Sequence, residues 1–289
     1  MFLDHPWSSD ASRVGGKGSS LGRLAEEFTV PPAFNLTTEA FDRWGEARHG
    51  SPDAPKAELP DGFCDAITEA YTRLASMCGT ERPAVAVRSS AIDEDGAESS
   101  FAGQHDTYLN IQGADAVVSA IIRCWASLDS DVALDYRRQS GLPIEGRQMA
   151  VVVQQMVPAD VSGVAFSANP VTGALGEVVI NSSWGLGESV VSGTVTPDTY
   201  IVEKSGSRVI SSDIAEKAVM TVSKGDGTAE VDVPRIMRAQ PSMSDETARE
   251  VARLAVALER RMGHPVDIEW AVYDKTVYLL QCRPITTLD

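Results

Sequence analysis

The stretch VDIEWAVYDKTVYLLQCRP, residues 266–284, predicts two β-strands joined by a short turn. The strands are expected over Val266–Val272 and Thr276–Cys282, with the letters YDK supplying the turn. Side chains two positions apart in a strand point to the same side of a sheet. The first strand therefore places Asp267 and Glu269 on one face. If the two strands pair as a hairpin, that face is strongly polar.

The second strand continues this polar face with Gln281 and Arg283, again two positions apart. Mg²⁺ is held in proteins by a few oxygen atoms together with substrate phosphates. A planar guanidinium matches phosphate oxygens well. One interpretation is a ligand site in which Glu269 and Gln281 hold Mg²⁺ and Arg283 binds phosphate. The other is a solvated face of ion pairs.

The composition is that of a folded, acidic protein. The chain has 289 residues, 43% hydrophobic and 23% charged, which suits one large domain or two closely associated lobes. The formal net charge of −16 repels polyanions, so we expect no nucleic-acid partner. A site for an anionic nucleotide must therefore gather the few basic residues locally.

Cysteine usage and the N-terminal sequence predict a cytoplasmic protein. The four cysteines are scattered without a CxxC pair, which favours reduced thiols over a disulfide framework or a zinc site. The first residues lack the basic and apolar regions of a signal peptide. No run approaches the roughly 18 apolar residues of a membrane span, so we expect no membrane partner.

The chain is predicted to be more helical in its first half and richer in sheet in its second half. A short helix is expected over Gly18–Glu27, and a long one over Ser244–Met262 with its first residue as N-cap. Between them, the runs MAVVVQQM, GVAFS, EVVIN and TYIV have the composition of strands. We expect a single domain over residues 1–289, with lobes of about 1–145 and 146–289.

The sequence Gly15-Gly16-Lys17-Gly18 is a candidate phosphate-binding turn. Glycine lets backbone amides approach a phosphate closely, and a following helix start adds a favourable dipole. Lys17 adds a mobile positive charge. The sequence is not a Walker A loop, because Gly18 stands where that loop needs Ser or Thr. The alternative is a glycine turn with a solvated lysine.

A second candidate begins where the strand-like run AVAV ends at Arg88. The guanidinium of Arg88 is suited to gripping a phosphate. An acidic loop then leads to Ser100–Gln104, whose small residues let backbone amides close over a ligand. The alternative is a strand, a mobile acidic loop and a hairpin without a ligand.

A third candidate is the sequence WGLGE, which ends at Glu188 and follows the strand-like run EVVIN. It is not the dinucleotide-binding fingerprint GxGxxG, because Val190 occupies the sixth position. Glu188 suits contact with a ribose hydroxyl or a metal. The alternative is a surface carboxylate in a tight turn.

Taken together and in this order, these segments resemble the ATP-binding domain that opens enzymes of the phosphoenolpyruvate synthase, pyruvate phosphate dikinase and rifampin phosphotransferase family. The segments that carry the resemblance are Val14–Gly18, Val30–Pro32, Thr37–Phe41, Arg88–Ser90, Ser100–Gln104, Thr107–Asn110, Val161–Phe166, Asn169–Pro170, Trp184–Glu188, Asp267–Trp270 and Gln281–Pro284. The resemblance implies an α+β chain with an ATP-grasp fold, in which ATP lies between two lobes.

The resemblance also implies a role for each candidate. Phosphate contacts fall to Lys17 and Arg88, and Arg283 steadies the transferred phosphoryl groups. Glu269 and Gln281 hold Mg²⁺, with Asp267 close by. The phosphates are capped by Ser100, Phe101, Ala102, Gly103 and Gln104. The adenine is contacted by backbone groups of Gln155, Met156 and Val157.

Enzymes of this family continue into a swivelling domain that carries a phosphorylated histidine. None of the four histidines of this chain stands in the Ser-His-Ala context of that domain. The resemblance implies that ATP yields AMP and phosphate, with the β-phosphoryl group passing to a histidine on a detached domain or another chain. The alternatives are an ATP-grasp ligase that activates a carboxylate as an acyl phosphate, and a non-catalytic ATP-binding subunit.

Overall fold

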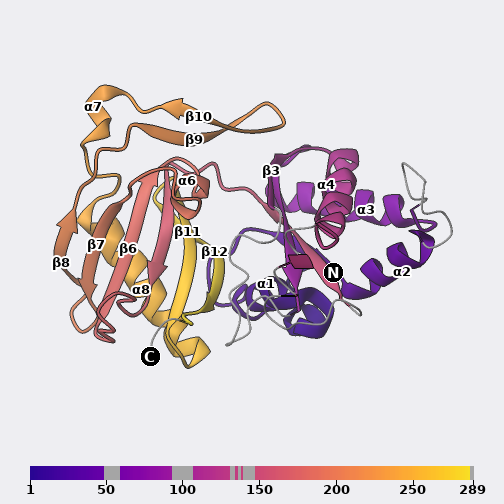
Figure 1. Cartoon of the computed structure of the whole chain (residues 1–289), viewed down its shortest axis with the longest axis horizontal. Coiled ribbons are helices and arrows are strands. Elements are labelled where there is room, and N and C mark those ends of the chain that lie inside the picture. Colours follow the sequence, from indigo (N-terminus) through magenta and orange to yellow (C-terminus); the bar gives the residue numbers. More distant parts are fainter. Residues whose placement is uncertain (49–58, 93–106, 131–133, 136–137, 139–146, 287–289) are drawn as a thin grey trace. The chain divides into compact units, whose positions relative to one another are not determined.

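The computed structural model describes residues 1–48, 59–92, 107–130, 134–135, 138 and 147–286, and the chain forms two compact units (Figure 1). The first unit comprises Met1–Glu26 and Pro32–Met156, and the second comprises Glu27–Pro31 and Val157–Asp289. Each unit combines helices with an antiparallel sheet, so the predicted α+β class is confirmed.

The first unit is built around a four-stranded antiparallel sheet in the order β1-β4-β2-β3. Its elements are η1 Pro6–Ser9, α1 Ala11–Leu24, β1 Ala33–Leu36, α2 Thr38–Arg48, α3 Phe63–Cys78, β2 Val85–Ala91, β3 Thr107–Ile111, α4 Ala114–Ser127 and β4 Met149–Gln155. Strand β4 pairs with both β1 and β2, which ties it into this sheet. The unit therefore ends at Met156 and not near residue 145, where the sequence placed the lobe boundary.

The two faces of this sheet have different characters, as the alternation of side chains along a strand requires. Val87 and Val153 lie opposite each other and join the core with Trp125 of α4. Arg88 and Ser90 point to the other face, where Ser90 is bonded to α1. The apolar face forms the core of the unit, and α1 lies against the polar face.

Helix α1 starts earlier than the sequence predicted. Asp10 caps its first turn by accepting a hydrogen bond from the Ser12 amide, at 3.0 Å. The helix then passes through the glycine-rich segment, and only Gly15 leaves helical geometry, with φ 70° and ψ 178°. The prediction of a start at Gly18 was wrong because a kinked helix, not a turn, accommodates these glycines.

The second unit contains a six-stranded antiparallel sheet in the order β12-β11-β5-β6-β7-β8 and a separate two-stranded ribbon, β9–β10 (Figure 1). Its elements are β5 Val161–Phe166, β6 Glu177–Trp184, α6 Glu188–Val191, β7 Asp198–Glu203, β8 Arg208–Asp213, β9 Val219–Lys224, β10 Gly227–Asp232, α7 Arg235–Arg238, α8 Asp245–Met262, β11 Val266–Tyr273 and β12 Thr276–Pro284. Helix α8 packs on the sheet through a buried stripe that includes Val251, Ala255 and Leu258. Within the described ranges, no helix combines the length and apolar character needed to cross a bilayer.

The predicted terminal hairpin and the predicted long helix are both confirmed. Strands β11 and β12 pair antiparallel, and β11 also pairs with β5. Ser244 caps α8 by accepting a hydrogen bond from the Thr247 amide, at 3.2 Å. The outer strand β12 is met by Glu27–Pro31, because the Leu279 amide donates to the Thr29 carbonyl at 2.9 Å.

Candidate functional site

The glycine-rich part of α1 lies directly against the end of β2. A Cβ atom on Gly15 would stand 2.0 Å from the Ser90 carbonyl oxygen, which no side chain allows. The positive φ of Gly15 is also a conformation that favours glycine. Lys17 Nζ donates to the Ser89 carbonyl at 3.2 Å. Two candidates more than 70 residues apart in sequence are therefore brought into contact.

Ser90 is the residue that fastens this contact. It is fully buried, and its Oγ accepts from the Gly18 amide at 3.1 Å and donates to the Val14 carbonyl at 2.8 Å. The hydroxyl thus supplies hydrogen bonds that the kink at Gly15 takes from the helix. The sequence reasoning treated Ser90 as part of a motif and did not foresee this task.

We expect Ser90→Ala to lower the free energy of unfolding by about 1–3 kcal/mol, because it strands a buried donor and a buried acceptor. Urea unfolding measures this difference. Ser76→Ala is the matched control, since it removes a hydroxyl that bonds to the Thr72 carbonyl on the exposed surface of α3. Equal midpoints for the two variants would contradict the fastening role of Ser90.

Two buried amides share the sheet face of Arg88 and were missed by the sequence reasoning. Gln154 in β4 lies opposite Ala86, and Asn35 in β1 lies opposite Val152, which itself pairs with Arg88. Each is only 2% exposed. Within the described residues, Asn35 Nδ2 and Oδ1 and Gln154 Nε2 have no hydrogen-bond partner. Their positions in the otherwise apolar runs AFNL and MAVVVQQ were the available signal.

The segment predicted to lie along adenine already uses part of its backbone. The Gln155 amide donates to the Pro32 carbonyl at 2.8 Å, and the Met156 amide donates to the Ala84 carbonyl at 2.9 Å. The Val157 carbonyl accepts from the Ala159 amide at 2.8 Å. These three backbone groups are therefore already bonded within the protein.

In the second unit, the β11–β12 hairpin brings its four polar residues together in two cross-strand pairs. Glu269 lies opposite Gln281, and Asp267 lies opposite Arg283. Asp267 is 7% exposed and Gln281 is 5% exposed. Because two of the four side chains are buried, the face is not the solvated surface that the alternative interpretation described.

Asp267 is bound to Arg283. Both Nε and Nη2 of Arg283 donate to Asp267 Oδ2, at 2.8 and 2.7 Å. Burial raises the pKa of Asp267, the Arg283 guanidinium opposes that rise, and the Glu269 carboxylate adds to it. In the described part of the chain, no group of three or more His, Cys, Asp and Glu residues is placed to hold a metal. Asp267 thus orients the Arg283 guanidinium, and Glu269 and Gln281, the residues predicted to hold Mg²⁺, lie opposite each other on the two strands.

The sequence WGLGE forms the turn between β6 and α6, and a neighbouring backbone sets its shape. Gly185 has φ 75°, and a Cβ atom there would stand 2.4 Å from the Thr221 carbonyl oxygen of β9. Ser162 Oγ donates to the Gly185 carbonyl. Glu188 is exposed at the start of α6, and its Oε2 accepts from Thr228 Oγ1 at 2.9 Å.

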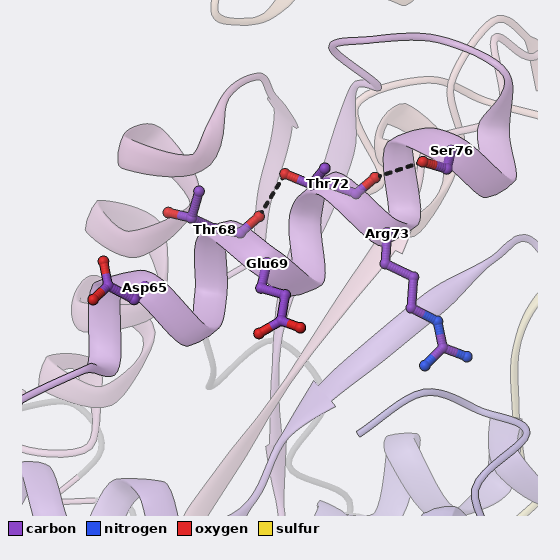
Figure 2. A pocket seen from close by; sticks show the side chains of 6 residues that line it. All are labelled: Asp65, Thr68, Glu69, Thr72, Arg73 and Ser76. Atoms are coloured by element: carbon purple, nitrogen blue, oxygen red, sulfur yellow. Dashed lines mark hydrogen bonds between the residues drawn. The ribbon is translucent and has the colours of Figure 1, made fainter.

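The predicted phosphate cap, Ser100–Gln104, lies outside the described residues. The pocket in Figure 2 is lined by one face of α3, and none of its residues is a predicted site residue. The hydroxyls of Thr72 and Ser76 in that pocket bond to carbonyls of the same helix, at 2.8 and 3.1 Å. The residues predicted to bind the phosphates and the metal lie elsewhere, on α1, β2, β11 and β12.

Comparison with known proteins finds relatives over nearly the whole chain. A probable phosphoenolpyruvate synthase of Methanocaldococcus jannaschii is 41% identical over 99% of this chain and 26% of its own length. A rifampicin phosphotransferase of Streptomyces sviceus is 39% identical over 97% of this chain and 35% of its own. The chain thus spans well under half the length of these relatives. The D-alanine–D-alanine ligase of Bacillus anthracis complexed with ATP is 10% identical, covering 99% of this chain and 58% of that one, with a TM-score of 0.37, which is too low to carry an argument.

The model of the pyruvate phosphate dikinase AMP/ATP-binding domain matches residues 54–289. The matched range includes all the predicted site residues except Lys17, and the match confirms the resemblance found in the sequence. The ATP-grasp fold was expected from that resemblance. The chain belongs to the family of the pyruvate phosphate dikinase AMP/ATP-binding domain.

Proposed function

We propose that this chain is the nucleotide-binding part of a phosphotransferase that acts on MgATP. The β-phosphoryl group passes to a histidine on a partner domain or partner chain, AMP leaves, and water takes up the γ-phosphoryl group to give inorganic phosphate. The observation that carries the proposal is the β11–β12 hairpin, in which Glu269 faces Gln281 and Asp267 faces Arg283. Each pair joins one buried and one half-buried polar side chain, in a chain of an AMP/ATP-binding family.

The phosphate-binding residues in this proposal are Lys17, Arg88 and Arg283. Lys17 and Arg88 come from the first unit, where α1 and β2 are fastened together. Arg283 comes from the second unit, oriented by Asp267. Such preorganised cations stabilise charge that develops on a transferring phosphoryl group. The relatives named as synthases and phosphotransferases support this reaction class.

The remaining roles concern the metal and the nucleoside. Glu269 and Gln281 present a carboxylate and a carboxamide oxygen side by side, which suits Mg²⁺. Mg²⁺, when bound, neutralises charge on the phosphates. Glu188 binds a ribose hydroxyl, and the backbone at Met156 and Val157 faces the adenine. The predicted phosphate cap Ser100–Gln104 completes the set as the sequence resemblance implies.

Calorimetry tests the metal role directly. We expect MgATP to bind more tightly than ATP in EDTA, because the phosphates and the carboxylate share the metal. Glu269→Gln should remove most of this difference by taking away a charge. Glu230→Gln, at an exposed position of β10, is the control and should leave it unchanged. Equal affinities of the unaltered protein in both conditions would exclude Glu269 and Gln281 as metal ligands.

A further inference from the structure

The β9–β10 ribbon buries too few of its own residues to be stable by itself. It is a two-stranded antiparallel pair in which Thr221 is the only buried residue. An isolated two-stranded hairpin is marginally stable in water. The ribbon must therefore be held by its ends and by the surface that it crosses. Figure 1 shows it as a separate element beside the six-stranded sheet.

The base of the ribbon is fixed by a buried ion pair. Lys217 and Asp198 are both completely buried, and Lys217 Nζ donates to Asp198 Oδ1. The same carboxylate accepts from the Ala215 amide at 3.0 Å and from the Ser242 amide at 2.7 Å. The chain entering the ribbon and the chain leaving α7 are thus tied to one carboxylate at the start of β7. The Val233 amide closes the base by donating to the Ala218 carbonyl at 2.9 Å.

The ribbon reaches the WGLGE turn at two points. The Leu186 amide donates to the Thr221 carbonyl at 2.9 Å, and the absence of a side chain on Gly185 permits that approach. Thr228 Oγ1, in the other strand of the ribbon, donates to Glu188 Oε2 at 2.9 Å. One contact holds the backbone of the turn, and the other holds the side chain of its only carboxylate.

We propose that the ribbon is a strap that sets the geometry of the WGLGE turn, and that Thr228 is a positioning residue for Glu188. Thr228 engages Oε2, which leaves Oε1 as the oxygen for a ligand hydroxyl. The hydroxyl-binding part of this inference rests on the proposed role of Glu188 in the function above. The strap itself rests only on the contacts between β9, β10 and the turn.

The test uses Thr228→Val, which keeps the shape of the side chain and removes the donor. Ser223→Ala is the matched control, since Ser223 lies directly opposite Thr228 in the ribbon and is exposed. The first readout needs no nucleotide. Hydrogen exchange of the Leu186 amide should be faster by about 3-fold or more in Thr228→Val, because the ribbon loses one of its two contacts with the turn. It should be unchanged in the control.

The second readout is the affinity for MgATP relative to its 2′-deoxy and 3′-deoxy analogues. The unaltered protein should prefer MgATP over one of them by about 10-fold or more. Thr228→Val should lose about 3-fold or more of that preference, and it should have no further effect when it is combined with Glu188→Ala. A coupling of this kind would not arise from a general loss of stability.

The outcomes separate the two proposals. Unchanged exchange at Leu186 in Thr228→Val overturns the strap, and an intact hydroxyl preference in that variant overturns the positioning role. If the unaltered protein binds the deoxy analogues as tightly as MgATP, the ribose role of Glu188 fails. Hydrogen exchange of the Leu186 amide alone then tests the strap proposal, and faster exchange in Thr228→Val supports it.

Discussion

Lys217→Met is expected to lower the free energy of unfolding by about 3–5 kcal/mol, the cost of breaking a buried ion pair by removing one partner. Methionine fills similar space, so the loss comes mainly from the Asp198 carboxylate, which stays buried without its cation. The Ala215 and Ser242 amides still donate to that carboxylate but do not neutralise it. Urea unfolding followed by circular dichroism measures the shift in midpoint.

Lys204→Met is the control for this prediction. Lys204 also pairs with a carboxylate, Glu259, but the two side chains are 16% and 26% exposed and solvent screens them. Lys204→Met should therefore lower the free energy of unfolding clearly less than Lys217→Met does. Asp198→Asn combined with Lys217→Met should recover part of the stability, because no unpaired charge is then buried. An equal fall in the free energy of unfolding for the two lysine variants would contradict the larger contribution of the buried Lys217–Asp198 pair.

Arg283→Lys is expected to lower turnover by about 10²–10³-fold, the loss typical of one preorganised transition-state donor. Lysine keeps the charge but cannot present a planar pair of donors, and it cannot reproduce the two bonds to Asp267 Oδ2. ATP affinity should fall far less, since the interaction is realised mainly in the transition state. The assay supplies the partner domain that carries the acceptor histidine and follows the products by phosphorus NMR.

Arg253→Lys is the matched control, because Arg253 lies on the exposed side of α8 and pairs with Glu246. It should leave turnover unchanged. An equal fall of turnover and ATP affinity in Arg283→Lys would mean that Arg283 only anchors the nucleotide. AMP and phosphate as products support the proposed route, whereas ADP formed with consumption of a carboxylate would support a ligase.

The terminal hairpin was predictable from sequence because its signal is local. Polar residues at every second position indicated one polar face on each strand, and the short turn between the strands indicated that they pair antiparallel. The structure adds that Asp267 is buried and bound to Arg283, which depends on packing against β5 and was not visible in the pattern. The role of Ser90 was also not visible in the local pattern, because its hydroxyl bonds to a helix more than 70 residues away in the sequence.

Where the sequence reasoning failed, long-range pairing was the reason. The run MAVVVQQM was correctly predicted as a strand, but nothing within it shows that its partners are β1 and β2. Lys217 stands alone in the letters IAEKAVM, so no spacing rule points to Asp198 as its partner. The glycines of α1 were assigned to a phosphate-binding turn because glycine lets backbone amides approach a phosphate closely, whereas Asp10 and Ser90 stabilise a kinked helix there.

The short segment Glu27–Pro31 has a consequence for how the polypeptide can be divided. Although it precedes most of the first unit in the chain, it belongs to the second, where Thr29 receives the Leu279 amide of the outer strand β12. Arg261 of α8 also pairs with Glu27, at 2.7 Å. Cleavage after Met156 therefore yields a carboxyl-terminal fragment with a bare sheet edge, and such edges recruit strands from other molecules. For this fragment to fold with its sheet edge covered, residues Glu27–Pro31 must be joined to it again beside β12, by circular permutation or by fusion.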